Sequence, residues 1–193
     1  MCGRFTQYNS REEYQVFLGE EAERDIPYDP EPVGRYNVAP GTRVLLLSER
    51  RSQLHVQSTL GARTSHCFFT DGWFEWKQQN GVKQPFFIYR KDGNPLLLAA
   101  IGKPPFENGN DQEGFLIVTA AADEGLLDIH DRRPLVYSPA AARKWLSENT
   151  TGKEAEEIAR EGSLSAEDFT WHPVSRAIGN PRNQGRELIE PLA

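Results

Sequence analysis

The 193-residue sequence has no long hydrophobic segment and no excess of basic residues. Its longest uninterrupted apolar run, Leu96 to Ile101, has six residues, whereas a membrane-spanning helix needs about 20. We therefore expect no membrane association. The 22 Lys and Arg against 28 Asp and Glu give a net charge of −6, which excludes a polycation that binds nucleic acid by bulk charge. A local basic groove stays compatible with this balance, because charged patches act only over about a Debye length.

Cysteine is also scarce. Cys2 and Cys67 are too few for a disulfide framework, and neither belongs to a Cys-x-x-Cys pair. The four histidines show no ligand spacing, so we expect no metal site and no cofactor. No secretory signal opens the chain. Together these features favour a reducing, cytoplasmic location.

Hydrophobic periodicity and turn residues predict one α+β domain over residues 1–193. A capping box at Ser10 predicts a short helix ending at Leu18, and Ser138 and Thr151 begin two later helices that end near 148 and 162. Pairs such as Asn-Gly and Asp-Gly, at 80–81, 92–93 and 108–109, predict hairpins. We expect a mainly antiparallel, barrel-like core flanked by short helices, with strands near 44–47, 54–56, 68–77, 85–89, 96–100, 115–120 and 171–174.

Cys2 is the most informative single position. Removal of Met1 would leave a free N-terminal cysteine, whose amine and thiol have ordinary pKa values of about 7.7–8.0 and 8.5. An amine and a thiol two carbons apart capture aldehydes, because the amine forms an imine and the thiolate closes a five-membered thiazolidine. The alternative is a small buried side chain with Met1 retained.

Glu75 and His130 are candidates for proton transfer. On a strand, Glu75 shares a face with Trp73 and Lys77, so it is either a carboxyl group whose pKa is raised among aromatic rings or a solvated partner of Lys77. His130 lies in a polar, turn-like segment and is either a proton shuttle or a surface histidine in an ion-pair cluster. We expect the other two candidates, Cys67 and His172, to be structural.

Polar side chains near the N-terminus form a third group. Arg4, Arg35 and Asn37 would contact a nucleic-acid strand, with Tyr36 or Trp76 available for stacking. Alternatively, they are loop residues bonded to carbonyl oxygens. Arg132 and Arg133, next to His130, could bind a phosphate.

The motifs together resemble the SOS response-associated peptidase (SRAP) family. The matching blocks begin with Met-Cys-Gly-Arg-Phe and include Asp-Gly-Trp-Phe-Glu-Trp and Ile-His-Asp-Arg-Arg-Pro. They follow the family's order along nearly the whole chain, at residues 1–5, 34–40, 71–76, 85–89, 119–123, 129–134 and 171–175.

The resemblance implies a function. The family recognises abasic sites in single-stranded DNA and links to them through its N-terminal cysteine as a thiazolidine, which shields the lesion. At the matching positions Cys2 forms the link, and Glu75 and His130 assist imine chemistry and proton transfer, including reversal. The family name also implies autoproteolytic removal of Met1. The implied partner is single-stranded DNA, and we expect a monomer.

One region departs from the family pattern. Family members carry a tryptophan-rich loop and an Asn-Ala-Arg-x-Glu-Thr motif before the block at 71–76, and here that region is compressed into residues 58–66. The remnant keeps an arginine, Arg63, as a DNA contact but lacks the Asn and the Glu. Either part of the DNA-binding surface is absent, or the sequence omits a segment.

Two other functions remain compatible with the sequence. One is a cysteine hydrolase or autopeptidase, with Cys2 or Cys67 as nucleophile and His130 as base. The other is a module that binds single-stranded DNA without a covalent step.

Overall fold

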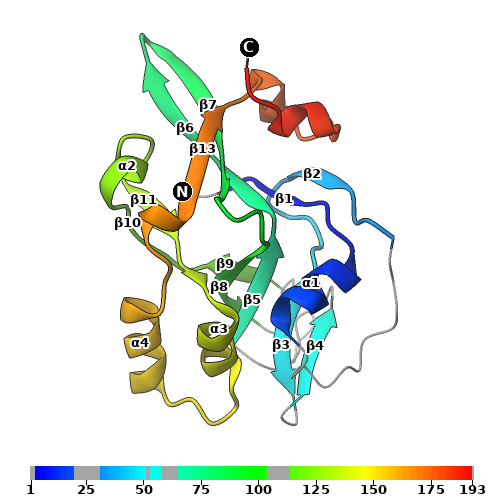
Figure 1. Cartoon of the computed structure of the whole chain (residues 1–193), viewed down its shortest axis with the longest axis vertical. Coiled ribbons are helices and arrows are strands. Elements are labelled where there is room, and N and C mark those ends of the chain that lie inside the picture. Colours follow the sequence, from blue (N-terminus) through cyan, green and yellow to red (C-terminus); the bar gives the residue numbers. More distant parts are fainter. Residues whose placement is uncertain (1–2, 20–30, 51–52, 58–64, 104–113, 193) are drawn as a thin grey trace.

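Antiparallel strands form the framework of the fold (Figure 1). The structure is a computed structural model that describes residues 3–19, 31–50, 53–57, 65–103 and 114–192. One sheet has the order β13-β7-β6-β1-β2. Its strands are β1 (Phe5–Gln7), β2 (Arg35–Val38), β6 (Gly72–Gln79), β7 (Val82–Arg90) and β13 (Phe169–Pro173).

A second sheet has the order β12-β8-β5-β3-β4, and β9 also pairs with β8. A separate pair joins β10 (Thr119–Ala121) and β11 (Arg132–Pro134). The second sheet consists of β3 (Leu46–Arg50), β4 (Gln53–Gln57), β5 (Ser65–Thr70), β8 (Leu96–Lys103), β9 (Gly114–Ile117) and β12 (Val136–Tyr137).

The α+β class is confirmed, whereas the expected barrel-like closure is wrong for the described residues, where the sheets remain separate and open. The predicted strand 68–77 is in fact two strands, because the chain leaves the second sheet after Thr70 and enters the first at Gly72. Asp71 is the residue between them. This transfer lets the two sheets pack against each other.

The helices begin where their capping residues predict. Ser10 and Thr151 each form a complete capping box, and Ser138 caps the helix that has Pro139 in its first turn. No helix among the described residues is long and apolar enough to cross a membrane. The helices are α1 (Arg11–Leu18), α2 (Glu124–Leu127), α3 (Pro139–Leu146) and α4 (Gly152–Glu161), with 3-10 turns η1 (Ala166–Asp168), η2 (Arg176–Gly179) and η3 (Arg186–Ile189).

The predicted hairpins have mixed outcomes. Asn80 and Gly81 have φ values of 50° and 78° and connect the paired strands β6 and β7, as a tight hairpin turn requires. The hairpin at 92–93 is wrong, because β7 and β8 lie in different sheets. The pair at 108–109 lies outside the described residues, although the strands on either side, β8 and β9, do pair.

Three hydrophobic clusters hold the layers together. The first joins the second sheet to α1 and α3 and contains Cys67 and Trp145. The second fills the space between the sheets and contains Trp73, Phe68 and Ile129. The third lies between the first sheet and the C-terminal segment, so the first sheet is covered on both faces.

Candidate functional site

The N-terminal segment lies against β6, the strand that carries Glu75. Phe5 pairs with Trp73 and Thr6 with Gly72 in antiparallel register. The pairing continues toward the N-terminus, because the Phe74 N–H donates to the carbonyl oxygen of Arg4 at 2.9 Å. Cys2 itself and Arg63 lie outside the described residues, as do residues 58–64 of the shortened region.

Glu75 is buried, with 4% of its surface exposed. It lies across from Phe86 of β7, next to the Trp73–Ile88 pair. Side chains two residues apart on a strand share a face, and Trp73, Ile88 and Phe86 all belong to the cluster between the sheets. Glu75 is therefore buried next to this cluster and does not lie on a solvated face.

His130 follows α2, and its side chain is 27% exposed. The Arg132 N–H donates to Nδ1 at 3.0 Å, and the Asp131 Oδ1 is also 3.0 Å from Nδ1. The first contact requires an unprotonated Nδ1 and the second a protonated one, so the two contacts are alternatives. A partly exposed imidazole is a suitable group for moving protons.

The segment containing His130 and the face containing Glu75 border the same cluster. Leu126 and Ile129, on either side of the end of α2, pack there with Trp73. Gly125 allows the close approach, because a Cβ at that position would lie 2.9 Å from the ring of Trp171. The fold thus places Glu75 and the residue that precedes His130 next to the same hydrophobic cluster.

Arg4 and Asn37 lie toward the other face of this sheet and hold the C-terminal segment. Asn37 is 1% exposed, and its amide donates to the carbonyl oxygens of Ile178, Asn180 and Asn183 at 3.1, 2.9 and 3.0 Å. Arg4 donates to Asn37 Oδ1 at 2.7 Å and to Ile178 O at 3.1 Å. For Arg4 and Asn37, the alternatives were contacts to a nucleic-acid strand and hydrogen bonds to carbonyl oxygens. The structure shows the hydrogen bonds to carbonyl oxygens.

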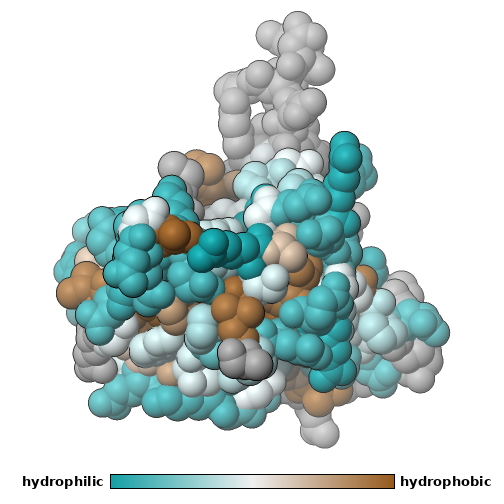
Figure 2. Space-filling model, turned by 90° about the horizontal axis from the view of Figure 1, so that it is seen from above, coloured by the Kyte–Doolittle hydropathy of each residue, from teal (hydrophilic) through white to brown (hydrophobic). Residues whose placement is uncertain are grey.

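The remaining predicted DNA contacts are spread over the molecule. Arg35 is partly buried, which lowers the pKa of its guanidinium, and it donates to the Arg43 carbonyl oxygen. Trp76 is half-buried against the C-terminal cluster. Arg132 is exposed and donates through Nη2 to Thr119 O at 2.7 Å. Viewed from the end where β6, β7 and the C-terminal segment lie, the surface is largely hydrophilic with smaller hydrophobic areas (Figure 2).

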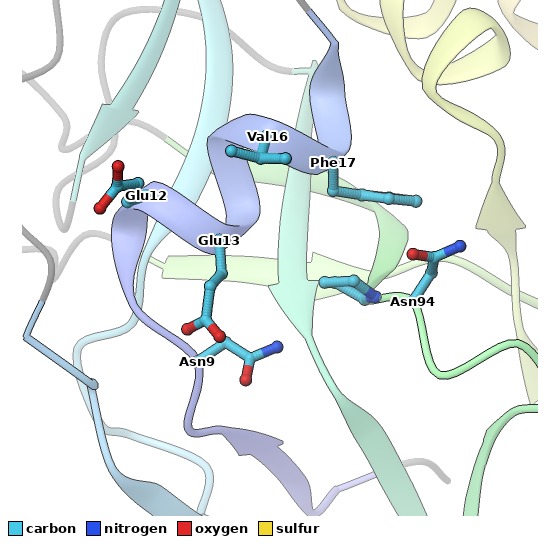
Figure 3. A pocket seen from close by; sticks show the side chains of 7 residues that line it. Asn9, Glu12, Glu13, Val16, Phe17 and Asn94 are labelled. Carbon is cyan, nitrogen blue, oxygen red and sulfur yellow. The ribbon is translucent and has the colours of Figure 1, made fainter.

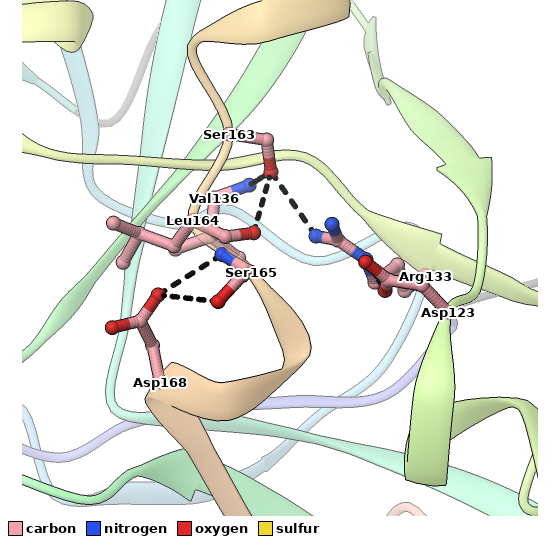
Figure 4. A network of polar contacts seen from close by, with 7 residues as sticks. All are labelled: Asp123, Arg133, Val136, Ser163, Leu164, Ser165 and Asp168. Atoms are coloured by element: carbon pink, nitrogen blue, oxygen red, sulfur yellow. Dashed lines mark hydrogen bonds and ion pairs between the residues drawn. The ribbon is translucent and has the colours of Figure 1, made fainter.

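Arg133 has a structural role in this geometry. Its side chain is 9% exposed, and Nε lies 2.9 Å from Asp123 Oδ1. Nη1 donates to Ser163 Oγ at 3.1 Å, and the same hydroxyl accepts from the Val136 N–H (Figure 4). These contacts fix β11, which directly follows His130 and Asp131. They leave Arg133 poorly placed to bind a phosphate.

Cys67 and His172 lie where a structural role requires. Cys67 is completely buried, and burial raises the pKa of its thiol well above the usual range. Because the thiolate is the reactive form, Cys67 is unsuited to act as a nucleophile. The His172 Nε2 lies 2.7 Å from Ile189 O and holds the C-terminal segment.

Sequence reasoning missed Asp71, the residue between the sheets. It is 6% exposed, and its Oδ2 accepts from the Tyr8 N–H at 2.7 Å, the Asn9 N–H at 3.4 Å and the Tyr14 hydroxyl at 2.8 Å. Burial raises the pKa of this carboxyl group to about 6, although the hydrogen bonds oppose the shift. An acidic residue inside an otherwise apolar strand pattern was the available signal.

A hollow of about 590 Å³ lies beside α1 (Figure 3). It contains none of the residues that the sequence analysis selected. In the described part of the chain, no group of three or more His, Cys, Asp or Glu could hold a metal ion. The hollow is lined by Asn9, Glu12, Glu13, Val16, Phe17, Asn94 and Pro95.

Comparison with known proteins gives consistent matches. The family model "SOS response associated peptidase (SRAP)" matches residues 59–181. The chain is 56% identical to "Abasic site processing protein YedK" of Escherichia coli, with both chains covered completely. It is 30% identical to the Xenopus tropicalis protein "Abasic site processing protein HMCES", over 63% of this chain and 42% of that one.

Solved structures share the fold. A phage-related protein from Bordetella bronchiseptica aligns with a TM-score of 0.70 and 28% identity, covering 91% of this chain and 95% of the other. A protein from Bacteroides thetaiotaomicron aligns over both complete chains with a TM-score of 0.75 at 15% identity. With the family model matching most of the sequence and the E. coli relative matching all of it, this chain belongs to the SRAP family.

Proposed function

We propose that this protein processes abasic sites in single-stranded DNA by linking covalently to them through Cys2. The observation that carries the proposal is the 56% identity, over both complete chains, to a protein named for abasic site processing. The position of the N-terminal segment supports it, because Gly3 is joined directly to Cys2 and precedes the residues paired with β6. The reactive aminothiol is thus one residue from a segment aligned with the strand that carries Glu75.

The proposed reaction starts with removal of Met1, which frees the amine of Cys2. An abasic sugar in its open form carries an aldehyde at C1. The amine nitrogen attacks this carbon, and water leaves as the imine forms. The thiol sulfur then adds to the imine carbon while its proton passes to the nitrogen, which closes the thiazolidine ring. Every atom of the thiol and the imine is retained in this last step.

Glu75 and His130 are the proposed proton carriers. Imine formation needs a proton delivered to the departing hydroxyl group, and a carboxyl group is a common general acid in such a step. His130, whose side chain is partly exposed, would accept a proton and return it. We assign to Glu75 the protonation of the carbinolamine hydroxyl group, which then leaves as water, and to His130 the proton exchange of ring closure and reversal.

The predicted DNA contacts divide into two roles. Arg35 and Arg132 are proposed to contact phosphates, and Arg63 would join them. Arg4 and Asn37 act indirectly, because their donors hold the C-terminal segment. Trp76 is half-buried and would offer only its exposed edge to a base. We further propose that the protein works as a monomer in the cytoplasm.

The shortened region at 58–66 should weaken DNA binding more than the chemistry. The alignment with the E. coli relative spans 222 positions against 193 residues here, so it contains gaps. Cys2, Glu75 and His130 all lie outside 58–66. Loss of a DNA-binding loop would therefore raise the DNA concentration required and leave the reacting groups in place.

The test uses a single-stranded oligonucleotide that carries one abasic site. The purified protein should give a band that survives denaturing electrophoresis, and Cys2→Ala should abolish it. An undamaged oligonucleotide of the same sequence is the matched control. Absence of the band with unaltered protein would overturn the proposal. Binding that is reversible and insensitive to Cys2→Ala would indicate the non-covalent module, and turnover of peptide amides by a Cys2 acyl-enzyme would indicate the hydrolase.

A further inference from the structure

The hydrogen bonds that the Asp71 carboxylate accepts come from the segment that follows the N-terminal strand. Two donors are the backbone N–H groups of Tyr8 and Asn9, directly after β1, and the third is the hydroxyl of Tyr14 in α1. A carboxylate that accepts backbone N–H groups fixes the path of the main chain itself. Asp71 therefore fixes the path of the main chain between β1 and α1.

The same carboxylate belongs to the strand junction that leads to Glu75. The next residue, Gly72, pairs with Thr6. The Asp71 N–H also donates to the Thr6 carbonyl oxygen at 3.3 Å. Toward the N-terminus, the pairing ends where Phe74 donates to the Arg4 carbonyl oxygen. Asp71 thus anchors one end of a short strand pair, and the segment leading to Cys2 leaves from the other end.

Such an anchor is needed because β1 has only three residues. Chain termini fray unless other contacts hold them, and bringing two reacting groups together depends on their relative position, so a displacement of about 1 Å costs up to about 100-fold in rate. A buried carboxyl group at this position also lowers the stability of the fold, because burial opposes its ionisation. An apolar residue would avoid that free-energy cost. In return, the carboxylate of Asp71 provides hydrogen bonds that fix the main chain at Tyr8 and Asn9.

We propose that Asp71 is a positioning residue, which holds the N-terminal strand in register on β6, so that the segment leading to Cys2 leaves from a fixed point on the strand that carries Glu75. This inference rests on the proposed covalent reaction of Cys2. Asp71 is buried and would act through the backbone of residues 5–9. Its removal should therefore lower the rate of the reaction and leave the affinity for DNA largely unchanged.

The first experiment measures link formation at a series of DNA concentrations. Asp71→Ala should lower the rate constant at saturating abasic DNA by about 10- to 100-fold, while the half-saturating DNA concentration changes less than about twofold. Asp71→Asn keeps an oxygen acceptor for the same donors and should recover most of the rate. Asp92→Asn, an exposed carboxylate in the turn after β7, is the matched control and should behave like the unaltered protein.

The second experiment needs no DNA. Amide hydrogen exchange at Tyr8 and Asn9 should quicken at least about tenfold in Asp71→Ala, because both N–H groups lose their acceptor, and should be unchanged in Asp92→Asn. If Asp71→Ala does not fold, Tyr14→Phe removes one of the three donors and should give a smaller change in the same direction.

The two measurements separate the possible failures. Unchanged exchange at Tyr8 and Asn9, or a link formed at the unaltered rate by Asp71→Ala, would overturn the positioning role. A parallel loss of rate and of DNA affinity would also overturn it, since that pattern indicates a general structural defect. If the unaltered protein forms no link, the proposed function fails, while exchange still decides whether Asp71 anchors the strand.

Discussion

Arg4 donates a hydrogen bond to the side-chain oxygen of Asn37 at 2.7 Å, and both residues also donate to the carbonyl oxygen of Ile178. Two neighbouring strands of the first sheet, β1 and β2, are thereby tied to the same point of the C-terminal segment. Asn37 is the centre of this arrangement, because its amide also reaches Asn180 and Asn183. The segment closest to the N-terminus therefore depends on the segment closest to the C-terminus.

Asn37→Ala should lower the free energy of unfolding by about 2–4 kcal/mol, because it removes the amide that donates to three carbonyl oxygens and the oxygen that accepts from Arg4. Urea-induced unfolding followed by tryptophan fluorescence measures this change. Asn149→Ala, at an exposed position after α3, is the control and should change stability by less than about 0.5 kcal/mol. A loss below about 1 kcal/mol in Asn37→Ala would show that the segment is held by its apolar contacts alone.

Gly72→Ala should destabilise the protein by about 1–3 kcal/mol, because an added Cβ would lie 2.4 Å from the Phe87 ring and 2.7 Å from the Ile88 carbonyl oxygen. Gly114→Ala is a matched control, since nothing lies within 4 Å of a Cβ there. Thermal unfolding of the two variants should show a clear loss for the first only. Equal melting temperatures would mean that the β6–β7 pair can shift without cost.

Stability should depend on pH through Asp71. The pKa of this carboxyl group is about 6 in the folded protein, against an ordinary value of 3.8. Folding therefore favours the protonated form, so its contribution to stability is complete below about pH 4 and is lost as the pH rises through 6. Relative to Asp71→Asn, the unaltered protein should lose roughly 2–3 kcal/mol between pH 4 and pH 7.

Denaturant unfolding of both proteins across this pH range measures the difference. Asp92→Asn is a comparison in which stability should change with pH in the opposite direction. Hydrogen bonds from Asn94 and the charge of Arg90 lower the pKa of the Asp92 carboxyl group. Its contribution is present above the ordinary pKa and is lost as the pH falls. A stability difference between Asp71→Asn and the unaltered protein that stays constant with pH would contradict the account.

Glu75→Gln should slow formation of the covalent link by about 10²- to 10⁴-fold, which is the usual contribution of a positioned proton donor or acceptor. The amide fits the same buried volume, so stability should change little in comparison. Single-turnover assays with abasic DNA in excess provide the rate constant. Lys77→Gln, two residues along the same strand, is the control for charge and should retain most of the rate. Equal rates in Glu75→Gln and the unaltered protein would remove Glu75 from the mechanism.

Local features of the fold could be predicted because their determinants are close in sequence. Ser10 and Glu13 are three residues apart and form the capping box that begins α1, and Asn80-Gly81 sets its own turn geometry. The transfer between sheets at Asp71 could not be predicted, because the pattern of residues 68–77 is equally apolar on both sides of it. Which strands pair across the molecule is decided by packing and not by local pattern.

The candidate site divides in the same way. Glu75 could be selected from its residue type among aromatic neighbours, and His130 from its polar segment. The role of Asn37 could not be foreseen, because the carbonyl oxygen of Ile178 lies 141 residues further along the chain. Asp71 was missed for the same reason, since Tyr14 is 57 residues away. The role of a buried polar side chain depends on its hydrogen-bond partners, and for Asn37 and Asp71 these partners are distant in sequence.

The most direct test of the covalent proposal is mass spectrometry of the N-terminal peptide after reaction with an abasic oligonucleotide. Trypsin cleaves after Arg4, so processed protein should yield Cys-Gly-Arg carrying the remaining DNA sugar, with the mass reduced by one water. The account predicts this modified peptide in unaltered protein and its absence from Cys2→Ala. A peptide that retains Met1 and carries no DNA, recovered from protein that nevertheless protects abasic DNA, would contradict it.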